Sequence, residues 1–193
     1  MQKEICLIHA FTAKESFGLE LVEAYRLASV ELGITLHFTD IHTLDFDPFI
    51  YPGRAAYELE SDLKDVIKSI VSSRHLAIFM PVYQAYIPTL SQAFFNKIFQ
   101  TDSLGRLPAQ IWGSHPGLSL KTARIISLLD HYSWMEFKVE RTTQYHPLKK
   151  SVLEILDFGK VYTTTIPPYY KHANSDYRDK WVKKIKILVE KTF

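Results

Sequence analysis

Cysteine is nearly absent from this sequence, since Cys6 is the only one in 193 residues. A single thiol excludes an internal disulfide and a metal site built from several cysteines. Cys6 lies within the apolar run at residues 5–8. We therefore expect it to be a small buried core residue rather than a nucleophile.

Glycine-rich motifs are missing as well. The chain has seven glycines and contains neither the Gly-x-Gly-x-x-Gly fingerprint nor the Gly-x-x-x-x-Gly-Lys phosphate loop. It has no Gly-x-Ser-x-Gly elbow, which argues against a Ser–His–Asp hydrolase. Its eight histidines show no i, i+4 spacing of the kind that binds zinc, so we expect no metal.

An excess of charge and a long apolar run are also absent. Lys and Arg number 23 against 21 Asp and Glu, a net charge of +2, which predicts no nucleic-acid partner. The Lys-rich run at residues 180–191 has the spacing of a solvated helix face. No run reaches membrane-spanning length and the N-terminal apolar stretch is too short for a signal peptide. We therefore expect a cytoplasmic protein without a membrane span.

Apolar segments of two kinds alternate along the chain. Short continuous runs predict strands buried on both faces of a parallel sheet, at residues 5–9, 34–39, 76–80, 123–129 and 160–165. Apolar residues at helical spacing predict helices, at residues 17–32, 59–71, 88–99, 147–156 and 175–189. Two long connections, residues 40–56 and 100–120, are predicted to be loops with a functional or interfacial role.

This order, strand then helix throughout, predicts one α/β domain over residues 1–193. Parallel strands joined by helices cross over right-handedly, which leaves few topologies. The commonest at this size is a three-layer sandwich around a five-stranded parallel sheet in the order 2-1-3-4-5. Ligands of such sheets bind beyond the carboxyl ends of the strands, beside strand 1. The loops after the first, third and fourth strands are therefore the candidate site.

The loop after the first strand, residues 10–18, offers the hydroxyls of Thr12 and Ser16 at the start of a helix. Backbone N–H groups at a helix N-terminus bind anions, so Ser16 is a candidate phosphate ligand. The alternative is that Ser16 is only a helix cap.

The loop after the third strand is bracketed by Pro81 and Pro88 and carries Tyr83 and Tyr86. A stiff turn with aromatic walls and backbone donors suits a planar ring such as a flavin, although a purely structural turn would have the same pattern. After the fourth strand, Asp130 and His131 are adjacent in the sequence. Adjacent side chains on a strand point to opposite faces, so no catalytic Asp–His pair is expected.

Together these loops resemble those of the flavodoxin-like NAD(P)H:quinone oxidoreductases, which include the modulator-of-drug-activity and general-stress-protein types. Residues 10–18 stand where the family has Ala-His-Pro, three variable residues and Ser-Phe-Asn. Residues 44–48, Leu-Asp-Phe-Asp-Pro, closely match the family segment after its second strand. Residues 80–88 match its Pro-x-aromatic…Pro loop. Further similarity covers residues 94–99, 120–127 and 148–159.

The resemblance implies a flavodoxin-like fold and an enzyme with FMN, or else FAD, as cofactor. It implies that NAD(P)H passes a hydride through flavin N5 to a small quinone-like acceptor, with no catalytic side chain. The phosphate end of the flavin maps to Thr12, Ser16 and Phe17. The flavin ring maps to Pro81, Val82, Tyr83, Gln84 and Ala85, and its far edge to Leu128, Leu129, Asp130 and Tyr132. A homodimer is also implied, with the aromatic residues at 46–51 and 83–86 on its surface.

The sequence departs from the family in each loop. Phe11 replaces the family histidine, Gly18 its asparagine, and Gln84 an aromatic residue. The Thr-Thr-Gly-Gly of the third loop is absent, and Asn96 and Lys97 stand for Asp-Arg. An alternative is therefore a flavodoxin-like binding or regulatory protein with weakened or lost flavin binding. A small electron-transfer flavodoxin is less favoured, because those proteins are strongly acidic.

Overall fold

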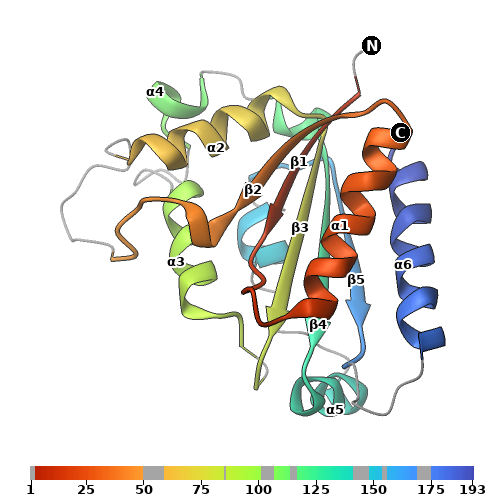
Figure 1. Ribbon diagram of the computed structural model, residues 1–193. Coiled ribbons are helices and arrows are strands. Elements are labelled where there is room, and N and C mark those ends of the chain that lie inside the picture. Colours follow the sequence, from red (N-terminus) through yellow and green to blue (C-terminus); the bar gives the residue numbers. More distant parts are fainter. Residues whose placement is uncertain are drawn as a thin grey trace.

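The predicted strands form one parallel sheet in the order β2-β1-β3-β4-β5, as expected. In the computed structural model (Figure 1) they are β1 (Glu4–His9), β2 (Thr35–Asp40), β3 (His75–Val82), β4 (Thr122–Leu129) and β5 (Lys160–Ile166). The structure describes residues 3–49, 59–84, 86–100, 107–113, 117–140, 148–153, 156–168 and 175–193. Each strand begins and ends within two residues of its predicted bounds.

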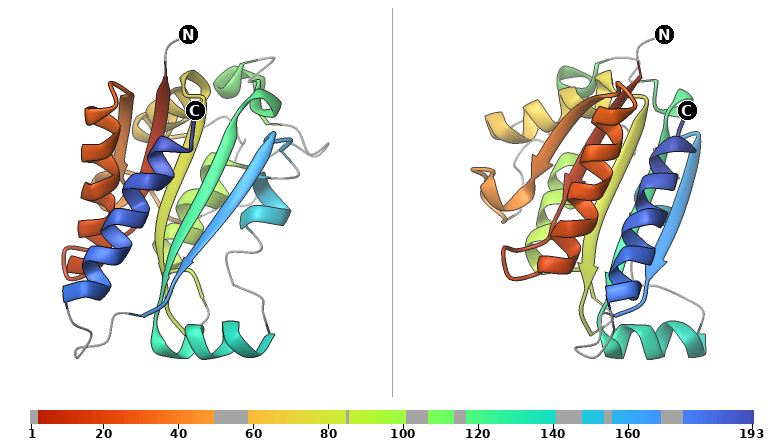
Figure 2. Two further views of the ribbon diagram at one scale, coloured as in Figure 1. Left: turned by 90° about the vertical axis from the view of Figure 1, so that its right-hand side faces the viewer. Right: turned by 45° about the vertical axis from the view of Figure 1, so that its right-hand side comes forward.

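Helices cover both faces of the sheet (Figure 2). On one face lie α1 (Ser16–Glu31) and α6 (Ser175–Glu190), side by side. They are joined by Arg178, whose Nε donates to Glu20 Oε2 at 2.7 Å. On the other face lie α2 (Ser61–Ser72), α3 (Thr89–Ile98) and the short α4 (Ala109–Trp112).

The alternation of side chains along each strand divides the core into two layers. Ile5 and Leu7 of β1 pack under α1 and α6, against residues such as Tyr25 and Ile185. Cys6 and Ile8 point to the other face and pack with α2 and α3. Because each central strand contributes to both layers, its sequence is mostly apolar.

Cys6 is fully buried, which confirms its assignment to the core. Burial raises the pKa of its thiol to about 12. None of the described helices is both long and apolar enough to cross a membrane.

The segment between β4 and β5 differs from the prediction. Residues His131–Glu140 form a helix, α5, which the sequence pattern did not predict because this segment has no regular apolar stripe. In place of the predicted helix at 147–156, residues Leu148–Leu153 form a short π-helical turn. Pro147 lies outside the described residues.

The two predicted loops contain short helical turns. Residues Ile41–Thr43 form a 3₁₀ turn within the first of them. In the second, α4 and a 3₁₀ turn at Leu118–Leu120 occupy part of what was predicted to be irregular. Turns of three or four residues are too short to produce a recognisable apolar period.

Candidate functional site

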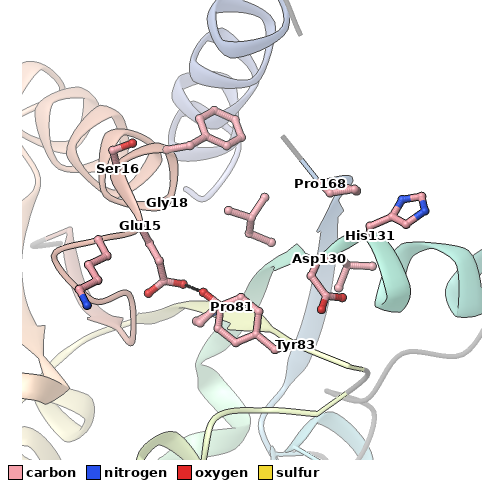
Figure 3. Close-up of a pocket in the computed structure, with 12 residues that line it drawn as sticks. Glu15, Ser16, Gly18, Pro81, Tyr83, Asp130, His131 and Pro168 are labelled. Carbon is pink, nitrogen blue, oxygen red and sulfur yellow. Dashed lines mark hydrogen bonds between the residues drawn. The ribbon is translucent and has the colours of Figure 1, made fainter. Parts of the chain in front are cut away.

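A cavity of about 380 Å³ opens at the carboxyl ends of the strands, beside the start of α1 (Figure 3). This volume lies in the usual range for small-molecule sites. Four segments contribute to its wall: the loop after β1, the end of β3, the end of β4 with the start of α5, and the loop after β5. The lining residues are Lys14, Glu15, Ser16, Phe17, Gly18, Pro81, Tyr83, Leu128, Leu129, Asp130, His131 and Pro168.

The cavity opens where β1 and β3 separate. Their register ends with His9 opposite Phe79, and the last bond between them runs from Ala10 N–H to the Phe79 carbonyl at 2.9 Å. Backbone groups on a strand alternate sides, so the nitrogen of Pro81 also faces the β1 side, where β1 has already ended. Pro81 therefore costs the sheet no hydrogen bond. On its other side, β3 continues in register with β4, Pro81 opposite Leu128.

A tight turn follows β3 and places Tyr83 at the cavity. Tyr83 and Tyr86 exchange both backbone hydrogen bonds, at 3.0 and 2.8 Å. Gln84, inside this turn, has a φ of 49°, in the left-handed region. The turn therefore orients the ring of Tyr83 toward the loop after β1.

Tyr83 and Glu15 link the two sides of the cavity. The Tyr83 hydroxyl donates to Glu15 Oε1, and the backbone N–H of Thr12 donates to Glu15 Oε2 at 2.5 Å. Burial raises the pKa of the Tyr83 hydroxyl well above its ordinary value, and the hydrogen bond that it donates to the Glu15 carboxylate raises that pKa further. The tyrosine is therefore a neutral hydrogen-bond donor at physiological pH.

Asp130 holds the opposite side of the cavity together. Its carboxylate accepts the Gln84 N–H at 2.9 Å and the Ser133 N–H at 2.7 Å, which makes it the N-cap of α5. Its own N–H donates to the Val82 carbonyl at 3.0 Å. Burial alone would raise the pKa of Asp130, but the hydrogen bonds from Ser133 and Gln84 outweigh it and lower that pKa.

Two departures from the family pattern lie against each other beneath the first loop. Phe11 is buried, 2% exposed, and its ring covers the backbone of Gly18. A Cβ built on Gly18 would lie 2.5 Å from Phe11 Cδ1. An apolar ring therefore takes the space that a larger residue at position 18 would need.

The structure brings together most of the residues predicted for the site. Those that line the cavity are Ser16, Phe17, Pro81, Tyr83, Leu128, Leu129 and Asp130. Four others, Thr12, Val82, Gln84 and Tyr132, are not part of the lining. Ala85 lies outside the described residues.

The predicted residues that do not line the cavity have other surroundings. Val82 is buried within β3, and Tyr132 is 60% exposed on α5. The N–H groups of Thr12 and Gln84 are bound to Glu15 and Asp130. Ser16 is the first residue of α1, and Glu15 rather than Ser16 is at the N-cap position.

Sequence reasoning missed several lining residues: Lys14, Glu15, Gly18, His131 and Pro168. Glu15 had one usable signal, because a carboxylate directly before a helix is favoured by the helix dipole. Pro168 also had a usable signal, because it follows the last strand and the carboxyl ends of all parallel strands meet at one edge of the sheet. The described residues hold no group of three or more His, Cys, Asp or Glu side chains arranged to bind a metal ion.

No protein-family model and no curated protein sequence matches this chain. Solved structures do match it in fold. The protein Smu.1420 from Streptococcus mutans superposes with a TM-score of 0.74 at 18% identity, covering 97% of this chain and 99% of that one. An NAD(P)H:quinone oxidoreductase from Methanothermobacter marburgensis gives 0.73 at 14% identity, covering 98% and 95%.

An FMN-dependent NADH-azoreductase from Bacillus anthracis, solved in complex with FMN, gives a TM-score of 0.69 at 10% identity, covering 98% of this chain and 99% of that one. The chain therefore has the flavodoxin-like α/β fold of these oxidoreductases over nearly its whole length. The fold neighbours agree with the resemblance to quinone oxidoreductases that the loop sequences indicate.

Proposed function

We propose that this chain is a flavin-dependent NAD(P)H oxidoreductase that passes a hydride through flavin N5 to a quinone or similar small acceptor. The observation that carries the proposal is the cavity between the ends of β1 and β3. It lies at the point of the sheet where ligands of doubly wound α/β folds bind. Most of its lining comes from the three loops that resemble those of the quinone oxidoreductases.

The side chains of the cavity fit a flavin ring. Pro81, Leu128 and Leu129 contribute apolar groups to the lining, and Tyr83 contributes an aromatic ring. Ser16 and the first turn of α1 lie at the other end, where they would hold the ribityl chain. A bound flavin supplies the hydride-transfer chemistry, so the protein need only bind it, orient it and exclude competing reactions.

A flavin is the proposed cofactor; the resemblance implies FMN, with FAD as the variant, and NADH or NADPH is the proposed hydride donor. A homodimer and a cytoplasmic location stay predictions from the sequence. Light scattering at micromolar concentration tests the dimer, and a monomeric mass would contradict it.

The test of the proposal begins with the colour of the purified protein. We expect absorbance bands in the near-ultraviolet and blue, either as purified or after addition of flavin. Denaturation followed by chromatography identifies any flavin released. The loaded protein should then oxidise NADH or NADPH when a quinone is present. A colourless protein that ignores added riboflavin, FMN and FAD would refute the proposal.

A second candidate is a flavodoxin-like binding or regulatory protein without turnover. The specific observation in its favour is that the N–H groups of Thr12 and Gln84 are both bound by the chain's own carboxylates, Glu15 and Asp130. A protein that binds flavin but does not oxidise NAD(P)H with a quinone acceptor would support this second candidate over the first.

A further inference from the structure

The polar end of the cavity already contains an anion, the carboxylate of Glu15. Glu15 occupies the N-cap position of α1, and its side chain caps no N–H of that helix. Instead it accepts the Thr12 N–H from the loop. It also accepts the Tyr83 hydroxyl from across the cavity, a bond that Figure 3 shows. It therefore stands at the helix start where a phosphate group of a ligand would be expected.

Among the described residues that line the cavity, the positive charges do not balance the negative ones. Lys14 contributes one positive charge to the lining, whereas Glu15 and Asp130 contribute one negative charge each. Asp130 is held by two backbone N–H groups and keeps its charge, because its pKa is lowered. Lys14, Glu15 and Asp130 together give these described lining residues a formal charge of −1.

Besides Lys14, the loop offers only the hydroxyls of Thr12 and Ser16 to offset this charge. Gly18 has no side chain, and Phe11 is buried beneath it. A phosphate monoester, which carries close to two negative charges near neutral pH, would lie beside the Glu15 carboxylate at the start of α1 and would be repelled by it. The hydroxyl groups of an uncharged ribityl chain could instead donate to that carboxylate.

We propose that Glu15 makes this cavity select flavins that lack a terminal phosphate, so that riboflavin binds more tightly than FMN. The inference rests on the proposed function, because it takes a flavin as the ligand. It assigns Glu15 as a specificity-determining residue: the carboxylate takes the place of the ligand's anion, and Tyr83 holds it there.

The experiment measures dissociation constants of the flavin-free protein for riboflavin and for FMN, by quenching of flavin fluorescence at pH 8. The readout is the ratio of the FMN constant to the riboflavin constant, which cancels changes common to both ligands. We expect a ratio above one for the wild type. Glu15→Gln should lower it about tenfold, because a neutral amide does not repel the phosphate.

Glu23→Gln is the matched control. Glu23 is exposed on the same helix and pairs with Arg26, away from the cavity. The substitution removes the same charge from the chain, so the ratio should stay at its wild-type value. An equal fall in Glu23→Gln would show that only overall charge matters and would overturn the inference.

A second variant keeps the inference testable if Glu15→Gln does not fold. Tyr83→Phe leaves every charge in place but removes one of the two donors that hold Glu15. It should lower the ratio by a smaller factor, because the carboxylate then moves aside more easily. An unchanged ratio in the folded variants, or a wild-type ratio of one or less, would overturn the inference.

These outcomes separate the inference from the proposed function. Binding of both flavins with a ratio insensitive to Glu15 refutes only the role of Glu15. Binding of neither flavin by wild type or variants refutes the flavin function and, with it, the inference.

Discussion

The ring of Phe11 fills the space that a side chain at Gly18 would occupy, with Phe11 Cδ1 2.5 Å from the position of a Cβ on Gly18. Gly18→Ala should therefore destabilise the protein. The steric cost of overpacking is about 1–3 kcal/mol, partly offset by the gain of about 1 kcal/mol for alanine over glycine in a helix. Urea unfolding measures the net loss, which we expect to be up to about 2 kcal/mol.

The same substitution in a Phe11→Ala background tests the cause. Without the ring, Gly18→Ala should become neutral or stabilising, because only the helix preference is left. If the loss were the same in both backgrounds, contact with Phe11 would not be its origin.

His75 should make stability fall at acidic pH. It is 2% exposed, with Nδ1 2.7 Å from Thr122 Oγ1, and burial, then the charge of Arg124, lower its pKa to about 3. As the pH falls below about 6.5, the imidazole of His75 becomes protonated in the unfolded chain but stays neutral in the folded chain. The contribution of neutral His75 to the free energy of unfolding is therefore complete above this pH and decreases by about 1.4 kcal/mol per pH unit, down to about pH 3.

Unfolding free energies at pH 7 and 4.5 measure this effect. His75→Gln should lose less stability between these pH values than the wild type, by about 2–3 kcal/mol. Thr122→Val is the control, since it removes the hydrogen bond but keeps the titrating imidazole. It should lower stability at both pH values and retain the wild-type pH dependence. Equal pH dependence in His75→Gln and wild type would contradict the assignment.

Lys97 should be important for stability because it is a buried cation. Its Nζ donates to Glu60 Oε1 at 2.6 Å and to the Asp47 carbonyl at 2.5 Å, so it ties the segment after β2 to α3. Lys97→Met leaves the Glu60 carboxylate without its counter-ion and should cost about 3–5 kcal/mol. Lys68→Met, which breaks the exposed pair with Asp65, is the control and should cost less than about 1 kcal/mol. Similar losses in the two variants would contradict this account.

Tyr83 and Tyr86 allow a matched test of the cavity. Both are exposed tyrosines of the same turn, but only Tyr83 lines the cavity. Tyr83→Ala should weaken riboflavin binding about fivefold, since an aromatic contact contributes about 1 kcal/mol. Tyr86→Ala should leave binding unchanged in the same fluorescence titration. If Tyr86→Ala weakened binding as much as Tyr83→Ala, the loss would not come from contact between the flavin ring and Tyr83.

Cys6 should be inert in the folded protein. It is fully buried and burial raises its thiol pKa to about 12, so neither access nor ionisation favours reaction. A coloured thiol reagent should react on the order of a hundredfold more slowly with native protein than with protein in denaturing urea. Rapid labelling of the native protein would contradict its place in the core.

The sheet could be predicted from the sequence because its central strands are buried on both faces. Residues 76–80 are a continuous apolar run, and residues 123–129 are apolar except for Arg124 and Ser127. A buried strand of a parallel sheet accounts for both segments. The helices that pack on the sheet have apolar stripes for the same reason. α5 lies at the rim and has no such stripe, so periodicity could not reveal it. Its signal was the capping residue Asp130, which hydrogen-bonds to Ser133.

The site could be predicted only in part. The loops were located correctly, because the end of each parallel strand fixes one of them. What the sequence could not show is which groups are already satisfied within the chain. Glu15 and Tyr83 are far apart in sequence, and Phe11 and Gly18 compensate for each other only through their contact in space. Such pairings depend on tertiary proximity rather than on local pattern.

Pro81 has a consequence for the permanence of the cavity. An ordinary residue at this position would present an amide hydrogen to the segment that follows Ala10, and the two segments could form one more backbone hydrogen bond. The imide nitrogen of proline has no hydrogen to offer. The fork between β1 and β3 is thus fixed by a covalent property of one residue, and the entrance stays open however the side chains around it rearrange.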